Sequence, residues 1–308
     1  MMNDPEHHPA PAKSARWYPI LLVGLPLWLA CSAGGALWYY FHKQEREAEM
    51  RRAAFAREIS VASLADDLRK FTVLIGERHS GEGEPSLNLM RAASMIEGVL
   101  GPSNTGLDIR RLRGPGNWPL LETSIPARRA GAKSVWVITG YDGPPGGNGG
   151  EFNASGLSAV IAAIQAAAND VPERHLRFLF LPHVHDPDAP VGDTLRMAAE
   201  AITARGEVDA VLWVEAMGTA PNLQLQANQP AALPIDQLAD LGSVAAGTHG
   251  LEAYEGVPPW LMEAVVRVST RAPYVAGEAD LDMPSPAIAT DAAGKLLELL
   301  RRIANRVD

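Results

Sequence analysis

Residues 135–156 read VWVITGYDGPPGGNGGEFNASG, an apolar strand pattern followed by an aspartate, a glycine-rich loop and a segment typical of a helix start. Apolar residues then recur at helical spacing from Leu157 to Ile164. A second apolar run, LRFLFL, occupies residues 176–181. Strand, helix and strand in this order predict a βαβ unit with parallel strands.

A third apolar run, DAVLWVEAMG at residues 209–218, follows a helix that we expect Asp193 to cap and Gly206 to end. This alternation predicts an α/β domain whose largely parallel sheet is covered on both faces. Near the C-terminus, a Thr290 cap and apolar residues at helical spacing predict an amphipathic helix that closes the domain.

The N-terminal part contains a long apolar segment. Residues 17–41 carry no charged side chain and are numerous enough to cross ~30 Å of hydrocarbon, so they predict a transmembrane helix with aromatic residues at both ends. A cleaved signal peptide would have a shorter apolar region. Lipid attachment at Cys31 is disfavoured, because the apolar run continues to Phe41.

The remaining boundaries follow from composition. Residues 1–16 form a polar tail, residues 42–60 predict a charged connecting helix, and the soluble domain covers residues 61–308. Ser63 and Asp66 resemble a capping box at the first helix of this domain. The formal charge of −9 and the pI near 5.4 argue against a nucleic-acid partner, which would require a basic patch to neutralise phosphates.

Polar residues follow all three predicted strands. They occur in ITGYDG at 138–143, FLPHVHD at 180–186 and VEAMG at 214–218. The carboxyl ends of parallel strands meet at one edge of a sheet, where sites form in α/β domains. We therefore expect a functional site that combines these three segments.

In chain order, GYD, FNASG, FLPHVH, EAMG and DMPSPAI resemble the motifs of the co-catalytic zinc aminopeptidases of clan MH. This family includes bacterial leucyl aminopeptidases, aminopeptidase Y, glutamate carboxypeptidases and glutaminyl cyclases. The resemblance covers residues 61–308 and implies a three-layer αβα sandwich with a mostly parallel mixed sheet. It also implies two zinc ions that share a bridging carboxylate, and a glutamate that acts as general base.

Matched residue by residue to that pattern, the chain lacks most of the metal chemistry. The first histidine ligand corresponds to Gly140, the bridging aspartate to Phe152 and the general base to Val184. Glycine, phenylalanine and valine offer no side-chain donor to a metal. The resemblance therefore implies a degenerate site for which we expect no cofactor.

Four further positions of the pattern keep polar side chains. His185 takes the place of a glutamate ligand, Glu215 that of an aspartate ligand, and Asp282 that of the last histidine. Asp142 corresponds to the carboxylate that hydrogen-bonds the first histidine ligand and fixes its orientation without binding the metal. In any register, the chain has no histidine after His249.

Two local patterns can be interpreted either as functional sites or as ordinary structural features. His183 and His185 form an H-x-H pair that, with Glu215 and Asp282, could hold one metal ion, but solvated or hydrogen-bonded histidines are the more common outcome. The loop GPPGGNGG at 143–150 lacks the lysine and serine of a phosphate cradle and predicts a flexible loop.

We therefore expect a membrane-anchored, catalytically inactive homologue that serves as a binding or scaffold domain for a peptide or a membrane-protein partner. The alternative is an active aminopeptidase-type hydrolase with a one-metal site at His185, Glu215 and Asp282. Lys and Arg residues are more numerous after the apolar segment than before it, which favours a cytoplasmic domain. The family resemblance favours an extracytoplasmic domain, which is our expectation.

Overall fold

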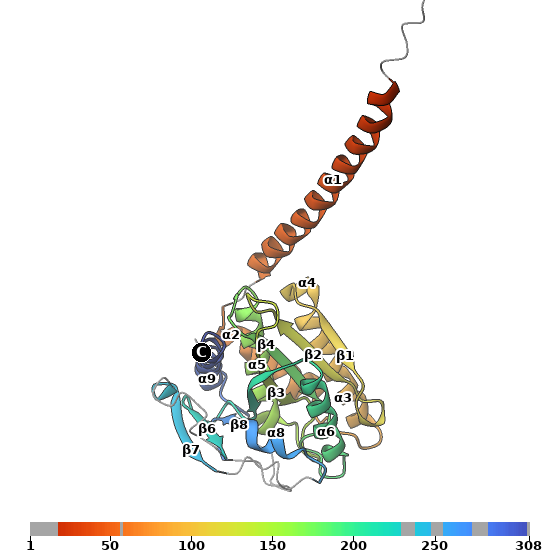
Figure 1. The fold of residues 1–308 in the computed structure, drawn as a ribbon. Helices are drawn as coiled ribbons and strands as arrows, with labels where there is room; N and C mark the ends of the chain where they lie inside the picture. The colour runs from red at the N-terminus through yellow and green to blue at the C-terminus, as the bar shows by residue number, and fades with distance from the viewer. Residues whose placement is uncertain (1–17, 56–57, 229–237, 248–254, 273–282, 307–308) are drawn as a thin grey trace, which may run out of the picture. The chain divides into compact units, whose positions relative to one another are not determined.

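The computed structural model describes residues 18–55, 58–228, 238–247, 255–272 and 283–306 (Figure 1). The chain divides into two compact units, Met1–Met50 and Arg51–Asp308. In the first unit, helix α1 (Tyr18–Phe55) continues through both the predicted transmembrane segment and most of the predicted connecting helix, and its last residues extend into the second unit.

Within the part of the chain that was described, no helix is both long and apolar enough to cross a membrane. The transmembrane helix over residues 17–41 is thus not supported by the structure and stays a prediction from sequence.

The second unit contains a mixed sheet flanked by helices. Its helices are α2 (Val61–Arg69), η1 (Lys70–Ile75), α3 (Glu84–Leu100), α4 (Pro102–Thr105), η2 (Pro115–Asn117), η3 (Gly150–Ala154), α5 (Ser155–Ala167), α6 (Val191–Thr203), α8 (Pro259–Ala264) and α9 (Pro286–Ala304). Its strands are β1 (Ile109–Leu112), β2 (Leu120–Ile125), β3 (Ser134–Gly140), β4 (His175–Leu181), β5 (Val208–Val214), β6 (Leu223–Ala227), β7 (Gly242–Ala246) and β8 (Val265–Ser269).

The described strands form one sheet in the order β1-β2-β4-β3-β5-β8-β6-β7. Strand β3 is parallel to β4 and β5, β5 is parallel to β8, and β6 is parallel to β7. Strand β2 is antiparallel to β1 and β4, and β6 is antiparallel to β8. The predicted βαβ unit of β3, α5 and β4 is confirmed at the centre of this mixed, mostly parallel sheet.

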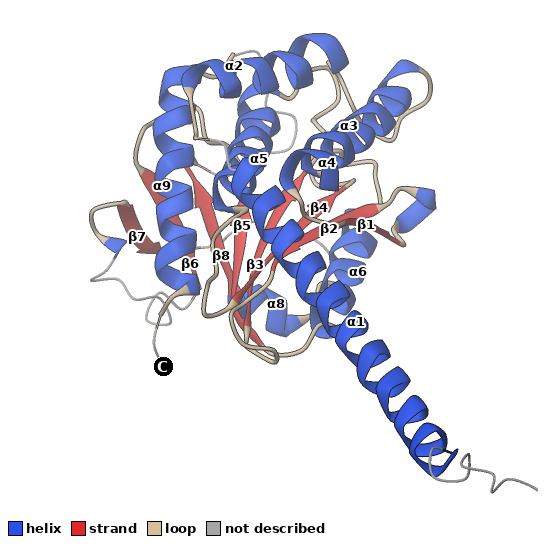
Figure 2. Ribbon diagram, turned by 90° about the horizontal axis from the view of Figure 1, so that it is seen from above, coloured by secondary structure: helices blue, strands red, loops and turns tan. Residues whose placement is uncertain are grey.

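Helices cover both faces of the sheet (Figure 2). On one face, α2, α3, α5 and α9 pack against the sheet with a continuous buried core that includes Leu157, Ile161 and Leu296. On the other face, α6 and α8 enclose a second core around Trp136 and Leu195. The predicted three-layer α/β architecture is therefore present, with strands buried on both sides as their apolar runs require.

Three predicted helix caps are wrong in position. Pro190, not Asp193, stands at the N-cap position of α6 (Val191–Thr203), and Asp193 lies in the first turn of that helix. Ser60, not Ser63, caps α2, because extended Ser60 accepts a hydrogen bond from the Ser63 backbone N–H at 3.2 Å. Ser285, not Thr290, caps α9, while the Thr290 hydroxyl lies within the helix and donates to the Pro286 carbonyl. Each helix begins a few residues earlier than its apolar pattern alone indicates.

Helix α5 starts unusually close to the end of strand β5. A Cβ atom added at Gly156 would lie 1.7 Å from the carbonyl oxygen of Glu215. Only glycine allows the two backbones to approach this closely. The glycine of the NASG segment is thus required by packing between α5 and β5.

Replacing Gly156 with alanine should therefore lower the free energy of unfolding by about 3 kcal/mol, because the helix must move away from β5. Gly294→Ala is the matched control, since Gly294 lies in helix α9 with no atom within 4 Å of a built Cβ. The control should be neutral or slightly stabilising. Urea unfolding followed by circular dichroism measures both variants, and equal stability of the two would contradict the packing argument.

Candidate functional site

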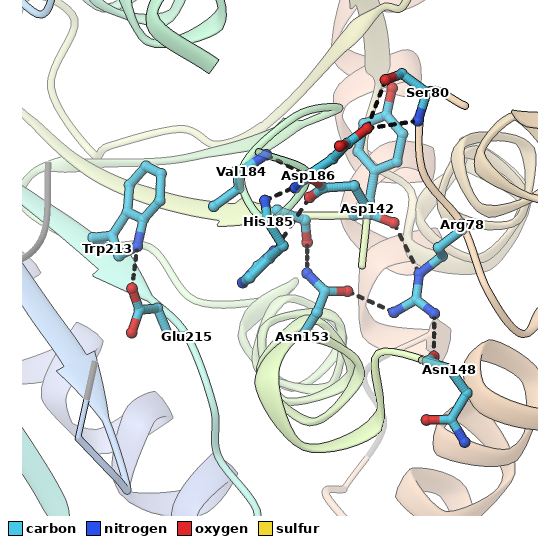
Figure 3. Close-up of polar contacts among 12 residues, drawn as sticks. Arg78, Ser80, Asp142, Asn148, Asn153, Val184, His185, Asp186, Trp213 and Glu215 are labelled. Carbon is cyan, nitrogen blue, oxygen red and sulfur yellow. Dashed lines mark hydrogen bonds and ion pairs between the residues drawn. The ribbon is translucent and has the colours of Figure 1, made fainter. Parts of the chain in front are cut away.

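The carboxyl ends of β3, β4 and β5 meet at one edge of the sheet, and Asp142 lies there just after β3 (Figure 3). Its side chain is fully buried. Oδ2 accepts hydrogen bonds from the backbone N–H groups of Val184, His185 and Asp186 at 2.7, 2.8 and 3.3 Å. Oδ1 lies 3.3 Å from Nδ1 of His185. One carboxylate therefore organises the loop that follows β4.

This arrangement changes the acidity of the carboxyl group. Burial by itself would raise the pKa of Asp142, but the hydrogen bond and charge interaction with His185 and the N–H groups of Val184 and His185 outweigh it. The net effect lowers the pKa below its usual range. Asp142 is consequently ionised at neutral pH and acts as a structural anion.

A second buried group, Arg78, holds the glycine-rich loop in place. Its guanidinium donates to the carbonyl oxygens of Tyr141 and Asn148 at 2.9 and 2.8 Å, and to Oδ1 of Asn153 at 2.6 Å (Figure 3). Asn153 in turn donates to the Gly140 carbonyl at 2.7 Å. The loop after β3 is thereby anchored at both ends, which its composition does not predict.

Gly140 and Val184, the positions expected for a histidine ligand and the general base, lie side by side. A Cβ atom built on Gly140 would approach the Val184 side chain to 3.1 Å and Oδ1 of Asp142 to 3.0 Å. The space that a larger side chain at position 140 would need is therefore occupied. Val184 itself is buried and apolar.

Phe152, at the position of the bridging carboxylate, contacts a cation. Its side chain is only 3% exposed. The guanidinium carbon of Arg271 lies 4.1 Å from the centre of its ring, within the range of a cation–π interaction. A guanidinium thus lies directly over the residue that replaces the expected metal bridge.

Glu215 has hydrogen-bond partners on both carboxylate oxygens. Oε1 accepts from Nε1 of Trp213 at 3.0 Å, and Oε2 accepts from Nε of Arg267 at 2.6 Å. Arg267 is fully buried and also donates to the Gln226 side chain and to the Arg271 carbonyl. Glu215 is therefore the anion of a buried ion pair.

The two histidines of the H-x-H pair, His183 and His185, differ in their hydrogen bonding. His185 contacts Asp142, as described above. His183 is fully buried, and neither ring nitrogen has a hydrogen-bond partner among the described residues. Burial lowers the pKa of His183, although the charges of Asp142 and Asp186 act in the opposite direction. Its ring meets Trp118 edge to face at a centroid distance of 6.1 Å.

The side chains at this edge do not fit two bridged zinc ions. Gly140, Phe152 and Val184 supply no donor, and the carboxylate of Glu215 is already bound by Arg267. In the described part of the chain, no group of three or more His, Cys, Asp and Glu residues is arranged to hold a metal ion. Asp282, the last predicted candidate, lies outside the described residues.

Sequence reasoning missed the arginines of this region. Arg267 interrupts an otherwise apolar strand, VVRVS, and a charge in such a position signals a buried ion pair. Arg78 and Arg271 lie in segments without periodicity, and their partners are distant in sequence. No local pattern identifies them.

The fold resembles solved aminopeptidases. The LapA aminopeptidase of Legionella pneumophila aligns with a TM-score of 0.60 at 12% identity, covering 86% of this chain and 75% of that chain. A leucine aminopeptidase precursor from Bacteroides thetaiotaomicron gives a TM-score of 0.59 at 10% identity, with coverages of 82% and 99%. A glutaminyl cyclase from an Acidobacteriales bacterium gives 0.55 at 13% identity, with coverages of 82% and 97%.

These similarities establish a fold shared with zinc-dependent exopeptidases and aminopeptidases. At such low identity they show the fold alone. No protein-family model matches the sequence, and no curated protein matches it.

Asp142→Asn should lower the free energy of unfolding at pH 7 by about 3 kcal/mol, because an amide cannot replace a carboxylate that accepts several N–H groups. Since the folded pKa of Asp142 is lowered, its contribution is complete above the unfolded value near 3.8 and is lost as the pH falls through the folded value. The variant should therefore lose less stability than wild type between pH 5 and acid pH.

The matched control is Asp188→Asn in the same loop, where the side chain is exposed. It should change stability by less than ~0.5 kcal/mol. Chemical unfolding at a series of pH values measures all three proteins. An Asp142→Asn protein that keeps the stability and acid sensitivity of wild type would refute this role of Asp142.

Proposed function

We propose that the chain is a catalytically inactive relative of the zinc aminopeptidases, in which the peptidase-like domain serves as a binding or scaffold domain. The observation that carries this proposal is the ion pair between Glu215 and Arg267, at 2.6 Å. The guanidinium of Arg267 binds the carboxylate of Glu215, which the resemblance assigns as a metal ligand.

The local charges support this proposal. Arg267 lies beside Glu215, and Arg271 lies over Phe152. A zinc ion placed here would face two guanidinium groups without the carboxylate that should bridge the metals, and repulsion between like charges is strong in a buried site. Val184 also offers no group that could take a proton from a metal-bound water.

The retained motif residues support the same view, because each has a structural role. Asn153 links Arg78 to Gly140, and the Ser155 hydroxyl accepts from the backbone N–H of Met217 at 2.9 Å. Gly156 allows the close approach to β5. Residues with a structural role are thus present, whereas the positions of the first histidine ligand, the bridging carboxylate and the general base carry Gly140, Phe152 and Val184.

The partner that we propose is a peptide or a membrane protein, bound at the edge of the sheet where β3, β4 and β5 end. The acidic net charge of −9 supports no nucleic-acid partner. The competing function is a one-metal aminopeptidase that uses His185, Glu215 and Asp282. It would require Glu215 to exchange Arg267 for a metal ion.

Metal analysis of the purified full-length chain separates the two functions. After exposure to equimolar zinc and removal of loosely bound metal, we expect less than ~0.1 equivalent of zinc, because the donors are absent or engaged. Hydrolysis of aminoacyl anilides should stay at the background rate. His185→Ala is the test variant and His79→Ala the control. One equivalent of zinc that only His185→Ala removes, together with turnover, would overturn the proposal.

The proposal includes a membrane anchor formed by residues 17–41, with the domain outside the cytoplasm. Its support is the uncharged apolar sequence and the family resemblance. The full chain should stay in the membrane fraction after alkaline carbonate extraction, whereas a chain lacking residues 1–41 should be released. A C-terminal reporter that is active only in the cytoplasm should be silent. Release of the full chain would disprove the membrane anchor, and an active reporter would disprove the extracytoplasmic location of the domain.

A further inference from the structure

A polar cavity lies at the opposite end of the sheet, next to the first residues of β4. Its volume is about 360 Å³, within the range of roughly 300–1,000 Å³ that is common for small-molecule sites. Three arginines line it, Arg110 from β1, Arg177 from β4 and Arg205 from the turn after α6, together with His175. Strand β4 separates this cavity from the Asp142 region by ~20 Å of extended chain.

Two of these arginines, Arg177 and Arg205, bind one buried carboxylate, Glu122. Arg205 binds it with two hydrogen bonds, from Nε at 2.9 Å and from Nη2 at 2.5 Å. Arg177 reaches it only through Nη1 at 3.3 Å. Arg110 lies directly across from Glu122 in the register of β1 and β2. Glu122 is therefore engaged chiefly by Arg205.

The cavity keeps an excess of positive charge. Its lining includes three arginines, the buried carboxylate of Glu122 and the exposed Asp108, which gives a net charge of +1 with His175 neutral. Burial, together with the nearby Arg205 and Arg110, lowers the pKa of Arg177 despite the opposing charge of Glu122. The lowered pKa means that the surroundings disfavour the charged form of Arg177, and a bound anion would stabilise that form.

Hydrogen-bond donors remain available in the cavity. Within the described residues, the Nη2 group of Arg177 and the whole guanidinium of exposed Arg110 have no hydrogen-bond partner. His175 accepts the Ala127 backbone N–H on Nδ1 at 3.1 Å, so the neutral ring carries its proton on Nε2. Ser124 also lines the cavity.

We propose that this cavity binds a phosphate group through Arg110, Arg177 and His175. Donors that come from different strands and line one cavity suit a tetrahedral oxyanion, whereas a planar carboxylate is satisfied by a single guanidinium. The cavity is larger than a phosphate group, so it can also hold part of the molecule to which the phosphate is attached. The phosphate belongs to a small soluble ligand or to a lipid headgroup. The site does not depend on whether the domain is catalytic.

Calorimetric titration of the full-length chain with inorganic phosphate tests the site. We expect saturable binding that Arg110→Gln weakens about tenfold, because one charged hydrogen-bond donor is lost. Arg110 is exposed and makes no ion pair in the described chain, so this variant should fold normally. Arg177→Gln should weaken binding at least as much. Arg196→Gln, which removes the same charge from the exposed face of α6, is the control and should bind like wild type.

A second arm identifies the source of the phosphate. The same proteins are mixed with phosphatidylcholine vesicles, with and without phosphatidic acid. Binding to phosphatidic acid that Arg110→Gln weakens supports a lipid headgroup, and phosphate binding without vesicle binding supports a soluble ligand. Absence of both at ~10 mM phosphate, or binding that Arg110→Gln and Arg177→Gln leave unchanged, overturns the proposal.

Discussion

The hydrogen bonds of the Asp142 carboxylate determine the geometry of the loops at the carboxyl ends of β3 and β4. It is fully buried and accepts backbone N–H groups from three consecutive residues of the loop after β4. A buried anion is tolerated only when its hydrogen-bonding capacity is filled. Here protein groups fill it, and these hydrogen bonds hold the loop after β4 against the end of β3.

The same principle explains the neighbouring arginines. Glu215 would be an uncompensated charge at the end of β5, and Arg267 neutralises it at 2.6 Å. Arg271 covers the ring of Phe152. Guanidinium groups thus provide positive charge at the edge of the sheet where the sequence resemblance implies zinc ions. Under the proposed function, ion pairs take the place of metal coordination there.

The sequence allowed the centre of this fold to be predicted and left its periphery open. Strands β3, β4 and β5 are buried on both faces and therefore have continuous apolar runs. The short edge strands β1 and β7 are half exposed, and their sequences, IRRL and GSVAA, carry no such pattern. The site positions follow from motif order, whereas the partners of Arg78 and Arg267 depend on contacts between distant segments.

The proposed function depends on Glu215 binding a guanidinium instead of a metal ion. Crystals of the protein grown with zinc, and measured on both sides of the zinc absorption edge, test this most directly. We expect no anomalous peak within bonding distance of His185 or Glu215, and an intact Glu215–Arg267 pair. A strong peak bonded to both residues, with Arg267 displaced, would contradict it.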